Sequence, residues 1–159
     1  TPLPGEAPDA TAERLAADKA RAVAPAWPDA LIIGSDQVAH IGDQVFGKPG
    51  SEERAIAQLQ QMSGQTVSFH TALALLNTRT GRLQVEGVPT RVRFRSLSED
   101  EIRRYVTAER PLDCAGSAKV EGLGITLLEA LSGDDPTALI GLPLITLSRM
   151  LRAEGVALP

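Results

Sequence analysis

Two long segments of strand-forming residues, joined by the turn dipeptide Thr80-Gly81, place the strongest constraint on how this chain folds. The two segments are residues 66–76 and residues 83–94, and the second of them alternates in character. The alternating positions are Val88, Thr90, Val92 and Phe94 on one side and Arg91, Arg93 and Arg95 on the other. A period of two residues places one set on a buried face of a sheet and the other set in water. The chain is therefore predicted to contain a long hairpin.

Helical segments alternate with these and with shorter strands. The residue pattern predicts helices over residues 10–24, from Ser51 to Gly64, from the capping-box pair Ser98 and Glu101 to about residue 107, and from Pro143 to residue 154. Short strands are predicted over residues 30–33, 38–41, 44–46 and 125–131. This order indicates an α/β or mixed α+β domain built on a mixed sheet.

The composition narrows the class of partner. The chain has 159 residues, a formal net charge of −4, one cysteine and 43% hydrophobic residues. That length suits one domain with a sizeable core, so residues 1–159 are interpreted as a single domain. The slight acidity provides no broad basic field for nucleic acid, and no apolar run approaches the length of a bilayer span. A lone cysteine excludes an internal disulfide framework, which predicts a reducing, cytoplasmic location.

Asp36 is the first candidate for chemistry. It stands in Gly34-Ser35-Asp36-Gln37, directly after the short apolar run of residues 30–33. In open α/β sheets ligands collect at the carboxyl ends of strands, where a carboxylate can bind a metal or take a proton from water. The alternative is that Asp36 only caps a turn, and its position alone does not separate the two.

Two lysines are candidates for binding phosphate. Lys48 lies between Gly47 and Pro49, on a backbone of restricted shape that can aim its ammonium group at a phosphate. The alternative for Lys48 is an ordinary exposed loop lysine, which is the commoner case. Lys19 lies on the charged first helix, and from the residues alone it is best interpreted as part of a solvated helix face.

A glycine-rich loop follows the third predicted helix. Residues 113–124 (DCAGSAKVEGLG) contain small residues that let a backbone approach a ligand closely, and Glu121 could accept hydrogen bonds from a base or a sugar. The alternative for Glu121 is a turn carboxylate. Cys114 is interpreted as a small filler because neither histidine lies in a Cys–His signature. An aspartate, an aimed lysine and this loop can together hold a phosphate ester with a metal, and they do not name the substrate.

Several segments, in order along most of the chain, resemble the Maf family of nucleoside triphosphate pyrophosphatases, whose older name is septum formation protein. One such motif is weak evidence, but their shared order and spacing are specific. The resemblance is carried by Arg14-Leu15-Ala16 with Lys19-Ala20, residues 31–37 (LIIGSDQ), Gly47-Lys48-Pro49, residues 55–64 (AIAQLQQMSG), 67–75, 113–124, Asp135-Pro136-Thr137 and residues 140–144 (IGLPL).

Two details resemble one branch of that family, the 7-methyl-GTP pyrophosphatases. Gln37 follows the aspartate, at a position where the dTTP/UTP branch usually carries Thr. Residues 117–122 (SAKVEG) also look like the 7-methyl-GTP branch, whereas the dTTP/UTP branch tends to show an aromatic residue and a glutamine there. The resemblance therefore implies hydrolysis of the α–β phosphoanhydride of 7-methyl-GTP, a house-cleaning reaction that yields the monophosphate and pyrophosphate.

The resemblance also implies roles for individual residues. Asp36 would be the proton acceptor beside a divalent metal (Mg²⁺, Mn²⁺ or Co²⁺), Lys19 and Lys48 would bind substrate, and Gln37 and Glu121 would govern the choice of base. An anionic Glu121 suits a 7-methylated guanine, whose ring is cationic. The family further implies a two-lobed, Maf/ITPase-like domain with a long mixed twisted sheet flanked by helices, a central cleft, and a possible homodimer.

Two alternative functions stay open, and one segment of the family pattern lies outside residues 1–159. A dTTP/UTP pyrophosphatase is the alternative within the family, and a catalytically weak nucleotide-binding regulator of cell division is the alternative from another class. The family pattern begins with a strand and a Ser-Pro-x-Arg-type loop that would precede Thr1 and supply an arginine for the triphosphate. A chain that really began at Thr1 is therefore expected to show little or no turnover.

Overall fold

The computed structural model describes residues 1–159. The α-helices are α1 (Pro8–Val23), α2 (Glu52–Met62), α3 (Glu99–Glu109) and α4 (Leu144–Ala153). The strands are β1 (Leu31–Ile41), β2 (Gln44–Phe46), β3 (Thr66–Asn77), β4 (Leu83–Phe94) and β5 (Leu128–Gly133). Short 3₁₀ helices cover Ala24–Ala26, Ala115–Ser117 and Leu123–Leu127.

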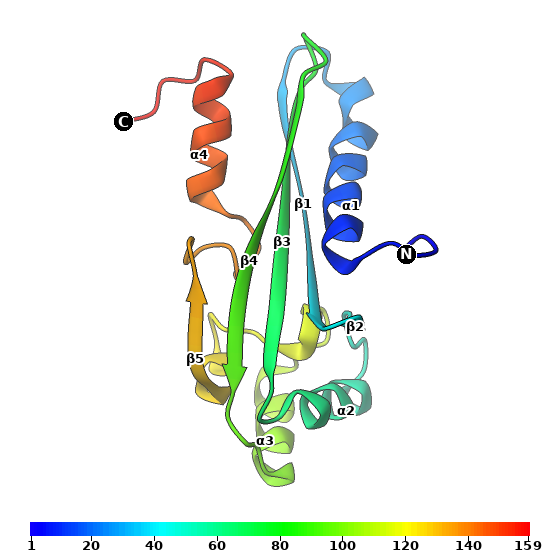
Figure 1. The fold of residues 1–159 in the computed structure, drawn as a ribbon, viewed down its shortest axis with the longest axis vertical. Helices are drawn as coiled ribbons and strands as arrows, with labels where there is room; N and C mark the ends of the chain where they lie inside the picture. The colour runs from blue at the N-terminus through cyan, green and yellow to red at the C-terminus, as the bar shows by residue number, and fades with distance from the viewer. The chain divides into compact units, whose positions relative to one another are not determined.

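The strands form a five-stranded sheet in the order β2-β1-β3-β4-β5 (Figure 1). β1 pairs antiparallel with β2, with His40 opposite Val45, and β4 pairs antiparallel with β5, with Val92 opposite Leu131. The expected α/β class is confirmed. A mixed sheet was expected, and these two pairings are antiparallel.

The chain divides into two compact units that share the long strands. Unit 1 comprises residues 1–37, 70–89 and 134–159, and unit 2 comprises residues 38–69 and 90–133. This division agrees with the two lobes that the resemblance implies. The interpretation of residues 1–159 as one domain stays a prediction.

In unit 1, helices cover both faces of β3, and α1 and α4 are drawn on opposite sides of the long strands (Figure 1). Leu73 and Leu75 form one buried cluster with Leu147 and Met150 of α4. On the other face, His70 Nε2 lies 3.6 Å from an oxygen of Glu13 on α1. Because neither face meets water, the second half of β3 is apolar without alternation.

Unit 2 shows the opposite pattern. Val92 and Phe94 of β4 are fully buried, whereas Arg91 and Arg93 are exposed, as the alternation predicts. In the same unit, α2 and α3 pack against each other. The predicted capping box is confirmed, since Ser98 Oγ accepts from Glu101 N at 3.1 Å and Glu101 Oε1 accepts from Ser98 N at 2.9 Å. The bonds that the Glu101 carboxylate accepts from Ser98 and Arg95 lower the pKa of Glu101 to about 2.

Two predicted boundaries are wrong. β1 continues through Gly34 to Ile41, where the sequence predicted a strand that ends at residue 33 and a separate strand from residue 38. Residues 123–127 form a 3₁₀ helix, so β5 begins at Leu128 instead of residue 125. None of the helices combines the length and the apolarity that a membrane crossing requires.

Candidate active site

Asp36 lies in the interior of β1, not at a strand end as the sequence predicted. The residue that misled the prediction is Gly34. A Cβ at Gly34 would lie well inside van der Waals contact of the Ala16 carbonyl oxygen and 3.0 Å from the Ala20 nitrogen. Gly34 is therefore required because the backbone of α1 crosses closely over β1, and it does not mark a turn.

This close approach brings Lys19 and Asp36 together. Lys19 Nζ donates to Asp36 Oδ1 at 2.8 Å and to the Ser35 carbonyl oxygen at 3.0 Å. The Lys19 side chain is 56% exposed and that of Asp36 is 21% exposed, so solvent and ligands can still reach the pair. The sequence-based interpretation of Lys19 as part of a solvated helix face therefore misses its partner, although the lysine is exposed.

The neighbours of Asp36 hold a loop that lies far away in the sequence. Ser35 Oγ donates to the Gly141 carbonyl oxygen at 2.7 Å. Gln37 Nε2 donates to Thr71 Oγ1 at 2.9 Å and lies within 3.3 Å of the carbonyl oxygens of Ala138 and Leu139. The amide nitrogen of Gln37 thus has its partners inside unit 1 and links β1 to the loop of residues 138–141.

Asp135 fixes the other end of this loop. Its carboxylate is 3% exposed and accepts from Thr137 N at 2.8 Å, Thr137 Oγ1 at 2.6 Å and Ile145 N at 2.9 Å. Burial raises the pKa of Asp135, but the bonds from Thr137 and Ile145 outweigh it, and the pKa lies below its ordinary value. Asp135 therefore caps the N-terminus of α4 across the loop.

The remaining two candidates belong to unit 2. Lys48 is exposed between Gly47 and the buried Pro49, and Gly50 N donates to the Leu112 carbonyl oxygen at 2.9 Å. The loop is thus fixed through its backbone while the lysine side chain stays in solvent. This agrees with a restricted loop that aims an ammonium group, and it leaves open what that group binds.

Glu121 is also exposed, on a loop whose backbone is held from α3. Tyr105 Oη donates to the Ser117 carbonyl oxygen at 2.7 Å and accepts from Lys119 N at 2.9 Å. Glu109 accepts from Leu123 N at 3.3 Å and pairs with Lys119 Nζ at 3.5 Å. Burial of the phenol raises the pKa of Tyr105, so this hydroxyl keeps the proton that it donates.

Other groups near this loop do not add a nucleophile or a metal cage. Burial and the Asp113 carboxylate raise the pKa of Cys114, which keeps the thiol protonated and agrees with its role as a filler. No three His, Cys, Asp or Glu side chains gather closely enough to hold a metal ion. Mg²⁺ is commonly bound by one or two carboxylates together with substrate phosphates. The residues therefore fit a cation that arrives with a nucleotide, with Asp36 as the protein carboxylate.

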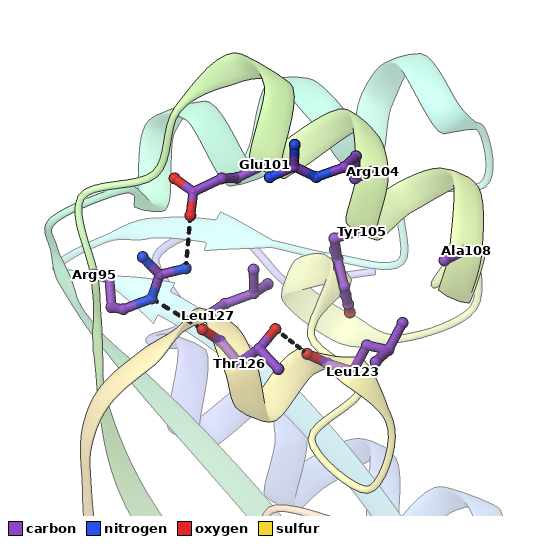
Figure 2. A pocket seen from close by; sticks show the side chains of 8 residues that line it. All are labelled: Arg95, Glu101, Arg104, Tyr105, Ala108, Leu123, Thr126 and Leu127. Atoms are coloured by element: carbon purple, nitrogen blue, oxygen red, sulfur yellow. Dashed lines mark hydrogen bonds and ion pairs between the residues drawn. The ribbon is translucent and has the colours of Figure 1, made fainter.

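A separate cavity in unit 2 has a volume of about 370 Å³ (Figure 2). It lies between α3 and the 3₁₀ helix at residues 123–127, and Arg95 spans its edge by donating to Glu101 at 3.0 Å and to the Thr126 carbonyl oxygen at 2.9 Å. None of the predicted site residues lines it. The cavity is therefore not part of the predicted site.

Sequence reasoning missed the residues that position the site loops. Asp135 was named only within the family resemblance, and neither Tyr105 nor Glu109 drew attention. Gln58 carried a signal that was overlooked, because it falls on the buried stripe of α2 with Ala55 and Leu59. A polar residue on such a stripe needs a hydrogen-bonding partner, and this requirement could have flagged it.

Known proteins show which family the chain belongs to. The family described as Maf-like protein matches residues 1–154. This chain belongs to the Maf family. It is 69% identical over 159 residues to the 7-methyl-GTP pyrophosphatase of Aromatoleum aromaticum. That match covers 100% of this chain and 82% of the Aromatoleum protein. It is 61% identical to the 7-methyl-GTP pyrophosphatase of Burkholderia thailandensis, over 99% of this chain and 75% of that protein. The Polaromonas sp. protein of the same name is 58% identical, over 99% and 72%.

Membership of the Maf family confirms the resemblance drawn from the sequence. The family assignment rests on nearly the whole chain, so it covers both units. The roles of Lys19, Asp36, Gln37, Lys48 and Glu121 are not decided by it and stay proposals.

Proposed function

We propose that this chain is a nucleotide pyrophosphatase that hydrolyses the α–β phosphoanhydride of 7-methyl-GTP to 7-methyl-GMP and pyrophosphate. The relatives that share 58–69% of its residues carry the name of that activity. The observation that carries the chemistry is the contact between Lys19 and Asp36, an ammonium group and a carboxylate 2.8 Å apart on facing elements of unit 1.

Asp36 is the proposed proton acceptor. Its carboxylate would orient a water molecule and take its proton as the oxygen attacks the α-phosphorus, while the bond from that phosphorus to the α–β bridging oxygen breaks and pyrophosphate leaves. A divalent cation bound with the triphosphate would neutralise phosphate charge. Lys19 contacts Asp36 in this structure, and an incoming phosphate would compete for its ammonium group. That exchange would release the carboxylate for the water.

Lys48 and Glu121 are the proposed substrate contacts of unit 2. Lys48 would bind phosphate as a point charge. The Glu121 carboxylate can accept from the N1–H and N2–H₂ groups of guanine together, and its charge favours the cationic 7-methylated ring. Gln37 would influence the choice of base indirectly, through the loop of residues 138–141.

The test is a panel of canonical and methylated nucleoside triphosphates, assayed with the full-length protein for released pyrophosphate, with Mg²⁺, Mn²⁺ or Co²⁺ and with EDTA. The expected result is the highest kcat/KM for 7-methyl-GTP and a loss of turnover in EDTA. Preference for dTTP or UTP would move the protein to the other branch. Nucleotide binding without any pyrophosphate release would reject the enzyme proposal.

A further inference from the structure

Gln58 occupies an unusual position on α2. The buried stripe of this helix contains Ala55, Leu59 and Met62, each 0% exposed, and Gln58 lies on the same stripe at helical spacing. An amide at such a position lowers stability unless both its donor and its acceptor find partners. Its contacts therefore show why a glutamine is tolerated there.

Both ends of the Gln58 amide are bonded, and each end holds a different loop. Gln58 Nε2 donates to the Gly47 carbonyl oxygen at 2.9 Å. Gln58 Oε1 accepts from Ser117 Oγ at 2.6 Å. The two loops also touch directly, since Gly116 N donates to the same Gly47 oxygen at 3.3 Å. One side chain thus ties the loop that begins at Gly47 to the turn at residues 115–117.

These loops carry the proposed substrate contacts of unit 2. Lys48 directly follows Gly47 in the sequence. Ser117 leads into the segment that presents Glu121, and Tyr105 bonds both the Ser117 carbonyl oxygen and Lys119 N. Ser117 is 0% exposed and has a left-handed backbone with φ of 58°, which a serine adopts only when its surroundings hold it. The bond to Gln58 is one of the contacts that hold it.

We infer that Gln58 is a positioning residue that fixes Lys48 relative to the loop bearing Glu121, so that phosphate and base are bound at a set spacing. The inference rests on the proposed function of those two residues. Gln58 touches no substrate in this scheme and acts through Gly47 and Ser117. Its removal would loosen two loops at once and weaken nucleotide binding more than the chemical step.

The experiment compares Gln58→Glu and Gln58→Met with the matched control Gln60→Met in the full-length protein. Glu keeps an acceptor for Ser117 but cannot donate to the Gly47 oxygen, whereas Met removes both bonds. Gln60 is exposed on the same helix. We expect kcat/KM for 7-methyl-GTP to fall about 5- to 30-fold in Gln58→Met, mostly through KM, as the loss of one or two hydrogen bonds implies. Gln60→Met should match the wild type.

A double-mutant cycle with Lys48→Met separates positioning from a general loss of stability. If Gln58 acts through Lys48, Gln58→Met should cost clearly less in the Lys48→Met background than in the wild type. Equal fold-losses in both backgrounds, or an unchanged KM in both Gln58 variants with unaltered melting temperatures, would overturn the inference. A wild type that releases no pyrophosphate would instead defeat the proposed function. Titration calorimetry of the same variants with 7-methyl-GTP would then decide on Gln58 from the binding constants alone.

Discussion

The candidate residues of the two units are held in opposite ways. In unit 1, Lys19 and Asp36 bind each other, and the close crossing of α1 over β1 creates the contact. In unit 2, Lys48 and Glu121 are exposed and form no ion pair, while hydrogen bonds fix the backbone of the loops that carry them. Under the proposed function, side-chain pairing would hold the chemical group in place until a ligand binds, whereas loop anchoring would leave the two charges free for that ligand.

The largest expected effect tests the pair in unit 1. Asp36→Asn removes the proposed proton acceptor but keeps the shape of the side chain. We expect kcat to fall about 10²- to 10⁴-fold, the range typical of a lost general base, with the Kd for 7-methyl-GTP changed much less. Initial rates of pyrophosphate release and calorimetric binding measure the two quantities. Asp43→Asn, in the exposed turn between β1 and β2, is the control and should leave both unchanged. Near-wild-type turnover in Asp36→Asn would remove Asp36 from the mechanism.

The next effect tests how the pair is assembled. Gly34→Ala adds a Cβ against the Ala16 carbonyl oxygen, so α1 must shift away from β1. We expect a loss of about 1–3 kcal/mol in the free energy of unfolding, the usual cost of overpacking, together with a lower kcat as Lys19 moves from Asp36. Chemical denaturation and steady-state rates check both. A Cβ at Gly47 meets nothing within 4 Å, so Gly47→Ala should keep wild-type stability. Equal stability of the two variants would contradict the close approach.

A third effect concerns Asp135, which anchors the loop that Ser35 and Gln37 contact. Because the folded pKa of Asp135 is lowered from 3.8, its contribution to stability is present above that pH and is lost as pH falls through the folded value. Asp135→Asn should lose about 1–3 kcal/mol at neutral pH, as expected when a hydrogen-bonded buried charge is removed. It should also lose less additional stability than the wild type on acidification from about pH 5 to pH 2. Denaturation curves between about pH 5 and pH 2 measure the free energy of unfolding of both proteins. An equal loss of stability on acidification in the two would rule out this role of Asp135.

The smallest expected effect concerns Glu121, an exposed residue of unit 2. Glu121→Gln removes a charge that makes no ion pair, so stability should stay within about 0.5 kcal/mol of the wild type. The ratio of kcat/KM for 7-methyl-GTP over GTP should fall several-fold, because the cationic ring loses its anionic partner. Competition between the two nucleotides gives that ratio directly. Glu53→Gln, exposed on α2, is the control. An unchanged ratio would show that Glu121 does not read the methylated base.

Much of the fold followed from local patterns. The alternation in β4, the capping box at Ser98 and the cap at Ser51 each involve residues a few positions apart, and the structure confirms them. Gly34 was misinterpreted because a glycine in a turn and a glycine under a crossing helix look the same in a sequence. Only the path of α1, which the local pattern does not contain, separates the two.

The candidate site shows the same difference between what neighbouring residues reveal and what contacts between distant segments decide. Lys19, Asp36 and Lys48 were found through motifs, but their arrangement depends on contacts between segments far apart in the chain. Lys19 meets Asp36 across 17 positions, and Gln58 meets Ser117 across 59. Such pairs leave no periodic trace in one sequence. The polar residue on the buried stripe of α2 was the one local sign of them.

The close packing at Gly122 sets where this enzyme's preference for a base can be altered. A Cβ there would displace the Glu109 carboxylate from Leu123 N and Lys119, whereas the side chain of the preceding Glu121 is exposed. A library aimed at new nucleotides should therefore diversify position 121 and keep glycine at position 122.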